Sequence, residues 1–118
     1  MLQRARLSWV AAPSHAMNRW NIPESLEAYI LERDMDCVYC RATFDPLSPR
    51  ARPTWEHIIN DLPMVTRENI ARCCMSCNSS KGNRPLAVWL DSTYCKNRGI
   101  TSEQVAEVVL AQLTRRGI

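Results

Sequence analysis

Apolar positions recur at helical spacing early in the chain. A polar residue, Asn21, is followed three positions later by an acid, Glu24, which is a pattern typical of a helix start. The residues that then share one helical face are Leu26, Tyr29, Ile30 and Arg33. The pattern predicts a helix from Ile22 to Arg33, and we expect residues 1–20 to form a poorly ordered tail.

The middle of the chain has the composition of strands and loops. The stretch from Thr43 to Pro53 contains three prolines, which cannot donate to a strand ladder, and predicts a loop. Trp55 to Ile59 is short and rich in β-forming residues, and a second short strand is expected to begin at Ile70. Turn-prone residues between 61 and 68 predict the connection between the two strands.

Helical signals return in the last third of the chain. A short helix is expected within residues 78–82, and Pro85 can open another with Leu86, Trp89 and Leu90 on its inner face. A second capping box at residues 101–104 predicts a last helix that ends near Gly117. Its inward-facing residues are expected to be Val105, Val108, Val109, Gln112 and Leu113. Together these elements predict a small α+β fold with flanking helices.

Length and charge narrow the possible classes of protein. The 118 residues allow one small domain, which we place at residues 21–118. No apolar run approaches the ~18–20 residues needed to cross a bilayer, so an integral membrane protein is not expected. The net charge of +3 is uneven, with −4 over residues 21–49 and +4 over residues 50–100. A basic second half suits a phosphate-rich partner, although surplus charge is also common on solvated surfaces.

Four of the six cysteines form two C-x-x-C pairs: Cys37 with Cys40, and Cys74 with Cys77. Two such pairs far apart in sequence are typical of a metal site rather than of disulfides, which indicates a reducing, cytoplasmic compartment. Four thiolates at ~2.3 Å from one zinc ion leave no open position, so we predict a structural zinc site of treble-clef type whose removal unfolds the domain. The other two cysteines are interpreted as packing residues: Cys73 and Cys95.

Three polar elements lie between and just after the cysteine pairs: Glu56-His57 on the first strand, Asn69, and Asn78. This arrangement resembles the HNH (ββα-metal) nuclease family, in particular its zinc-stapled branch, which includes restriction-type and phage nucleases. The stretches that carry the resemblance are residues 37–40, 55–60 and 69–82. It covers about residues 37–84, and leaves the C-terminal helices at 85–116 outside.

The resemblance implies a metal-dependent endonuclease that acts on DNA and gives each motif residue a role. His57 matches the family histidine that takes a proton from water, and Asn69 matches the asparagine that holds the metal loop and the histidine in place. Glu56 and Asn78 match the ligands of a second, catalytic ion, Mg²⁺ or Mn²⁺. Glu56 departs from the usual aspartate by one methylene, which puts the metal distance and preference in doubt.

General chemistry supports these roles independently of the resemblance. Phosphodiester hydrolysis needs a nucleophile and positive charge for developing oxyanions, which a hard cation on oxygen ligands supplies. An unperturbed imidazole titrates near pH 6.5 and accepts protons at neutral pH. Each residue also has an ordinary structural interpretation, as an exposed strand pair or as cap and turn residues. The alternative is therefore a non-catalytic zinc module that binds nucleic acid or a protein partner.

Basic and aromatic residues near the motif suggest how a partner would bind. The predicted nucleic-acid contacts are Lys81, Arg84 and Arg72, each of which could also be an ordinary solvated charge. Contacts to phosphates give affinity without reading sequence. Trp55 and Trp89 are expected in the core rather than as base-stacking platforms. The resemblance leaves open a role within a larger phage or restriction assembly.

Overall fold

The computed structural model describes residues 21–61 and 63–115, so the expected tail at residues 1–20 lies outside the described part. The elements, in chain order, are α2 (Glu24–Arg33), β1 (Pro53–His57), β2 (Ile70–Cys74), α3 (Met75–Lys81), α4 (Leu86–Leu90), α5 (Thr93–Arg98) and α6 (Glu107–Arg115). None of these helices is long and apolar enough to span a membrane. The predicted small α+β fold is confirmed.

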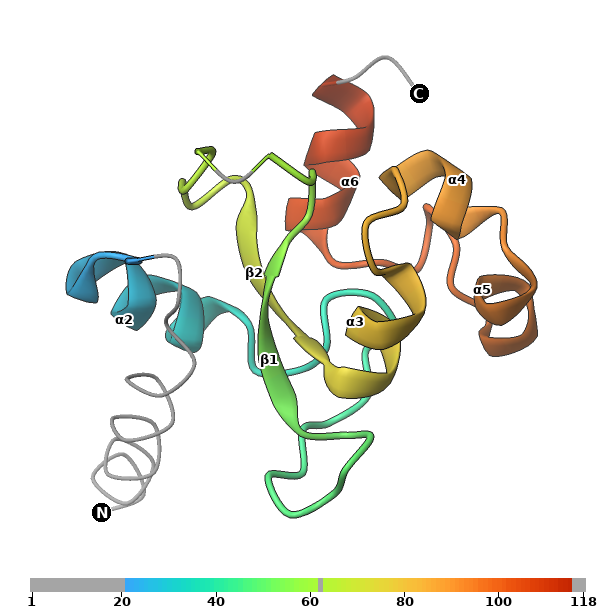
Figure 1. The fold of residues 1–118 in the computed structure, drawn as a ribbon, viewed down its shortest axis with the longest axis horizontal. Coiled ribbons are helices and arrows are strands. Elements are labelled where there is room, and N and C mark those ends of the chain that lie inside the picture. Colours follow the sequence, from blue (N-terminus) through green and yellow to red (C-terminus); the bar gives the residue numbers. More distant parts are fainter. Residues whose placement is uncertain (1–20, 62, 116–118) are drawn as a thin grey trace.

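The antiparallel hairpin of β1 and β2 forms the middle layer of the molecule. Its register sets Trp55 opposite Arg72 and Glu56 opposite Ala71. Because successive strand residues point to opposite faces, Trp55 and Arg72 face one side while Glu56 and Ala71 face the other. Helix α2 lies on the first side and α3 to α6 lie on the second (Figure 1). Every residue of both strands is therefore buried.

Each face of the hairpin has its own apolar cluster. On the α2 side, Trp55 and Ile70 pack with Ile22 and Ile30. The larger cluster on the other side joins the first cysteine pair, β2 and the C-terminal helices, and its largest member is Trp89. The Trp89 ring meets the Tyr39 ring edge-on, with centroids 4.8 Å apart. Trp55 and Trp89 are both buried, so their predicted core positions are confirmed.

The turn that carries the first cysteine pair connects distant parts of the chain. The backbone N–H of Val38 donates to the carbonyl of Arg72 in β2 at 3.1 Å. The carbonyl of Val38 accepts from the N–H of Ala106 at 2.8 Å, just before α6. One residue of this turn therefore links β2 to the C-terminal helix.

Three predicted element boundaries in the first half are wrong by two residues. Helix α2 begins at Glu24 rather than Ile22, because Asn21 adopts a left-handed conformation with φ 56° and Pro23 takes the cap position without a side-chain hydrogen bond. Strand β1 begins at Pro53 rather than Trp55 and ends at His57, whereas the predicted start of β2 at Ile70 is confirmed. Pro53 is tolerated because it is the first residue of its strand.

The C-terminal prediction needs two corrections. The last helix begins at Glu107 rather than near Thr101, because the Ala106 N–H donates to Val38 instead of to a helical partner. Helix α5 was not predicted, although the sequence contains its boundaries. The side chain of Ser92 caps its start, accepting from the N–H of Cys95, and Gly99 ends it in the left-handed conformation.

We predict that the glycines after α3 and α5 tolerate alanine differently. Gly99 has φ 68° and ψ 28°, with open space where a Cβ would lie, whereas Gly82 has φ 52° and ψ −128°, a region open almost only to glycine. Gly99→Ala should lower the free energy of unfolding by about 1 kcal/mol, and Gly82→Ala by about 2–3 kcal/mol. Urea unfolding of both zinc-loaded variants measures the difference, and equal losses would contradict it.

Candidate functional site

The four predicted zinc ligands converge on one point. The sulfurs of Cys37, Cys40, Cys74 and Cys77 all lie within 4.8 Å of one another, and those of Cys40 and Cys74 are 3.8 Å apart. A tetrahedron of sulfurs ~2.3 Å from zinc has edges of about 3.8 Å. The geometry and the all-thiol donor set therefore fit one zinc ion, and the predicted convergence of the four thiols is confirmed.

The two cysteine pairs are built differently. In the first pair, a tight turn lets the N–H of Cys40 donate to the Cys37 sulfur at 3.5 Å, and Arg41 follows with φ 66°. In the second pair, Cys74 ends β2 and caps α3, where its sulfur accepts from the N–H of Cys77 at 3.4 Å. The cluster thus joins a turn that lies outside the helices and strands to the junction between β2 and α3.

The four thiols influence one another's protonation. Hydrogen bonding from Cys37 lowers the pKa of Cys40 and lowers the pKa of Cys74 to about 7. Hydrogen bonding with Cys40 raises the pKa of Cys37, and hydrogen bonding with Cys37 raises the pKa of Cys77. Zinc binds cysteine as the thiolate, so metal binding releases thiol protons from this cluster. Cys73 and Cys95 stand outside this cluster, and burial raises the pKa of each, as expected for packing residues.

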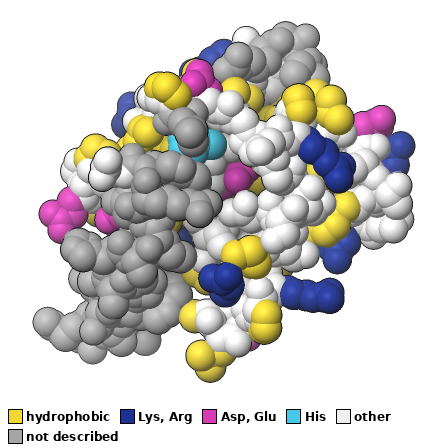
Figure 2. Space-filling view, viewed as in Figure 1, with side chains coloured by type: hydrophobic (Ala, Val, Ile, Leu, Met, Phe, Trp, Pro, Cys, Tyr) yellow, Lys and Arg dark blue, Asp and Glu magenta, His cyan; other side chains and the backbone are white. Residues whose placement is uncertain are grey.

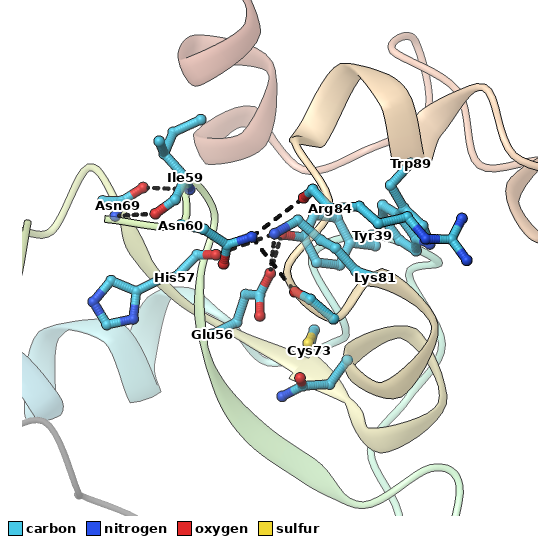
Figure 3. Close-up of polar contacts among 12 residues, drawn as sticks. Tyr39, Glu56, His57, Ile59, Asn60, Asn69, Cys73, Lys81, Arg84 and Trp89 are labelled. Carbon is cyan, nitrogen blue, oxygen red and sulfur yellow. Dashed lines mark hydrogen bonds and ion pairs between the residues drawn. The ribbon is translucent and has the colours of Figure 1, made fainter. Parts of the chain in front are cut away.

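Glu56 lies on the α3 side of the hairpin in an enclosed polar network (Figure 3). Its Oε2 accepts from the Tyr39 hydroxyl at 2.6 Å and lies 3.0 Å from Lys81 Nζ. Lys81, whose side chain has no exposed surface, also donates to the carbonyl of His57 at 3.3 Å. Burial raises the pKa of Glu56, and the Lys81 charge opposes that rise. The carboxylate therefore already has an internal cation beside it.

Two asparagines hold strand β1 and the loop that follows it. The side chain of Asn78 donates to Thr54 Oγ1 at 2.8 Å and to the carbonyl of Trp55 at 3.3 Å. The fully buried Asn69 accepts from the N–H of Ile59 at 2.8 Å and donates to its carbonyl at 3.1 Å. Contacts on both sides therefore fix the segment that contains Glu56 and His57.

His57 is the last residue of β1 and points away from Glu56 (Figure 3). It pairs with Ile70 across the hairpin, and it is buried. The structure thus brings Glu56 and Asn78 to one face of the hairpin and directs His57 to the other. These predicted residues come together only around the carboxyl end of β1, and their catalytic roles stay predictions.

The three predicted nucleic-acid contacts lie in different environments. Lys81 is enclosed, and Arg72 is buried with its guanidinium 4.9 Å from the ring centre of Phe44. Burial lowers the pKa of Arg72 to about 10. Arg84 is exposed in the loop after α3. Figure 2 shows the Lys and Arg side chains of one face in separate patches rather than one basic surface. In this conformation only Arg84 of the three reaches the surface.

Sequence reasoning missed the partners of Glu56. Tyr39 stands inside the first C-x-x-C turn, where no pattern marks its hydroxyl as functional. The burial of Lys81 had a signal, because Lys81 follows Cys77 by four residues and therefore shares its helical face. A lysine on the ligand side of so short a helix is directed into the core.

The predicted catalytic ion has donors of the right chemistry and an internal competitor. The Glu56 carboxylate and the Asn78 amide are oxygen ligands suited to Mg²⁺ or Mn²⁺. Because the Lys81 ammonium lies 3.0 Å from Glu56 Oε2, a divalent ion and the ammonium would compete for the same carboxylate. Within residues 21–61 and 63–115, one group of three or more His, Cys, Asp or Glu side chains is placed to share an ion. That group is the four cysteines.

Comparison with known proteins identifies one relevant similarity. The chain is 31% identical, over 87 aligned residues covering 68% of its length, to the CRISPR-associated endonuclease Cas9 of Corynebacterium diphtheriae. It spans 7% of the length of that protein. No family model matches the chain, and no solved structure matches it. The similarity and the four-cysteine cluster together support an HNH-like zinc module.

We predict that zinc removal unfolds the domain. The four ligands close a loop of more than thirty residues, and metal binding contributes folding free energy in small zinc domains. Protein treated with a chelator should lose its far-UV circular dichroism, and loaded protein should contain one zinc per chain by mass spectrometry.

Two neighbouring cysteines provide a matched test of the ligand set. Cys74→Ala should lose zinc, whereas Cys73→Ala, at an adjacent and equally buried position outside the cluster, should retain it. The opposite result would show that Cys73 replaces Cys74 as a ligand.

We predict that the buried pair of Glu56 and Lys81 is coupled. Glu56→Gln leaves a buried ammonium without a counter-charge and should lower the free energy of unfolding by about 3–5 kcal/mol. Adding Lys81→Met should recover most of that loss in urea unfolding. Lys96→Met, which breaks an exposed pair with Asp91, serves as the control and should change stability by less than about 1 kcal/mol. Additive effects of the two core substitutions would contradict the coupling.

Proposed function

We propose that this chain is a metal-dependent endonuclease that hydrolyses DNA phosphodiester bonds with a water molecule activated by His57. The observation that carries the proposal is the convergence on one strand of three motif residues far apart in sequence. Asn78 holds residues 54 and 55, Asn69 holds residue 59, and His57 lies between these two points of attachment. The similarity to an endonuclease supports the same function.

In the proposed reaction, His57 acts as the general base. Its imidazole takes a proton from water while the water oxygen bonds to phosphorus and the bond to the 3′ oxygen breaks. By family resemblance, the products carry 5′-phosphate and 3′-hydroxyl ends. Asn69 acts as a positioning residue, because its two hydrogen bonds to the backbone of Ile59 hold the chain immediately after the histidine.

Glu56 and Asn78 would hold the catalytic ion. The ion supplies positive charge to the phosphate and the leaving oxygen. The Asn78 amide nitrogen is engaged by Thr54 and Trp55, which orients the side chain and leaves its oxygen as the ligand atom. Because Lys81 already neutralises Glu56, we expect the divalent ion to bind weakly and to be needed in excess.

Arg84 is the proposed contact for the DNA backbone. It is exposed, and its carbonyl accepts from Asn60 Nδ2 at 3.2 Å. Asn60 belongs to the loop that follows His57, so this bond holds the arginine loop close to the proposed base. A guanidinium in this position would bind phosphate and give affinity without sequence preference.

A non-catalytic zinc module remains the second candidate, and one observation favours it. The enclosed ion pair of Glu56 and Lys81 is a stable arrangement that needs no divalent ion. A module of this kind would bind a nucleic acid or a protein through its surface and would show no dependence on Mg²⁺ or Mn²⁺.

Cleavage of supercoiled plasmid tests the nuclease. Zinc-loaded protein should nick or linearise DNA when Mg²⁺ or Mn²⁺ is added, and His57→Ala should lower the rate by at least about 100-fold. Zinc content and circular dichroism of the variant should equal those of the wild type. Samples without added divalent ion are a cleaner control than EDTA, which would also remove the zinc.

Matched variants separate the two candidates. Lys96→Ala, an exposed change on α5, should cut at the wild-type rate. A His57→Ala protein that cuts as fast as the wild type would remove the base assignment. Absence of cleavage with every metal, together with a gel-shift affinity that falls in Arg84→Ala, would favour the binding module.

A further inference from the structure

The hydroxyl of Tyr94 reaches the zinc cluster from a helix outside the nuclease-like motif. Tyr94 is the second residue of α5, and its Oη lies 3.4 Å from the Cys77 sulfur. The same oxygen lies 2.8 Å from Ser76 Oγ. The contact therefore joins α5 directly to a predicted metal ligand, Cys77.

The direction of these two hydrogen bonds follows from the chemistry of the ligand. A cysteine that binds zinc does so as a thiolate, which can only accept. The Tyr94 hydroxyl must then donate its single proton to Cys77, and Ser76 must donate to the Tyr94 oxygen. A phenol hydroxyl is protonated at neutral pH, so Tyr94 has this proton to donate.

Neighbouring groups fix the position of the Tyr94 ring. The Arg98 guanidinium lies 3.9 Å from the ring centre, and the Trp89 ring lies 6.0 Å away at a tilt of 31°. A cation over the face of an aromatic ring is attracted to it, so Arg98 helps to hold the Tyr94 ring in place. The ring is therefore held in the orientation that points the hydroxyl at sulfur.

A comparison of three of the sulfurs shows how Cys77 differs. Cys37 and Cys74 accept from the N–H groups of Cys40 and Cys77, three residues further along the chain. The equivalent donor for Cys77 would be the N–H of Ser80, but Ser80 lies inside α3, where backbone N–H groups bond within the helix.

We propose that Tyr94 is a positioning residue of the zinc site, which replaces the missing backbone donor and stabilises the Cys77 thiolate. Four thiolates and one zinc ion carry a net charge of −2, so each donor to sulfur lowers the cost of holding that charge in a partly buried site. Helix α5 thereby controls how firmly the zinc is retained. This role does not depend on nuclease activity.

Tyr94→Phe tests the proposal, because it removes the hydroxyl and keeps the ring under Arg98. The apparent zinc affinity should fall by about 10–100-fold, measured by competition with a chromogenic chelator. Ser92→Ala is the matched control. It removes the cap of the same helix, α5, without touching the hydroxyl, and should leave the affinity within about threefold of wild type.

Cobalt substitution provides a readout that helix stability alone would not change. Loss of a hydrogen bond to the thiolate should move the sulfur-to-cobalt charge-transfer band to lower energy in Tyr94→Phe and leave it in place in Ser92→Ala. Arg98→Met, which keeps the hydroxyl, should give a smaller shift in the same direction. An unchanged band and affinity in Tyr94→Phe, or equal losses in Tyr94→Phe and Ser92→Ala, would overturn the proposal.

Discussion

The meeting of four cysteine sulfurs is the constraint on which the rest of this fold depends. The first pair stands in a turn with little secondary structure of its own, and the second joins the end of β2 to the start of α3. Bringing them together closes a long loop, and the hairpin that carries the polar motif lies within that loop. A domain of this size has a small apolar core, so we expect a metal at this site to contribute much of the stability that a larger domain obtains from its core.

The burial of the hairpin limits how Glu56 and His57 can act together. Because both faces are covered, alternation along β1 sends Glu56 toward the C-terminal helices and His57 toward the side of α2. The enclosed contact of Glu56 with Lys81 then gives the carboxylate a cation of its own. A substrate that contacts both Glu56 and His57 would therefore have to bind at the carboxyl end of β1, where the two faces of the hairpin meet.

Much of the fold was predictable, because its signals were local. The two C-x-x-C pairs predicted the four-thiol cluster, and the apolar run Leu86 to Leu90 predicted a short helix packed on the core. One prediction failed because a distant residue competed for a backbone group. The capping box at residues 101–104 was overridden because the N–H of Ala106 bonds to Val38, a partner that no local pattern reveals.

The candidate site was less predictable than the fold, for the same reason. A basic residue beside a motif suggests a phosphate contact, yet Lys81 is directed inward by its place on α3 and Arg72 by its place on β2. Their charges therefore lie in the interior and add little to the surface, and charge counted along the sequence overstates what a nucleic acid would encounter.

The link from Val38 to Ala106 also bears on the order of events when the chain is made. The turn around Val38 is synthesised before Ala106, so its carbonyl receives this partner only when the segment before α6 has emerged. This domain therefore cannot be completed before residue 106 has been synthesised, although that residue is not one of the predicted metal ligands.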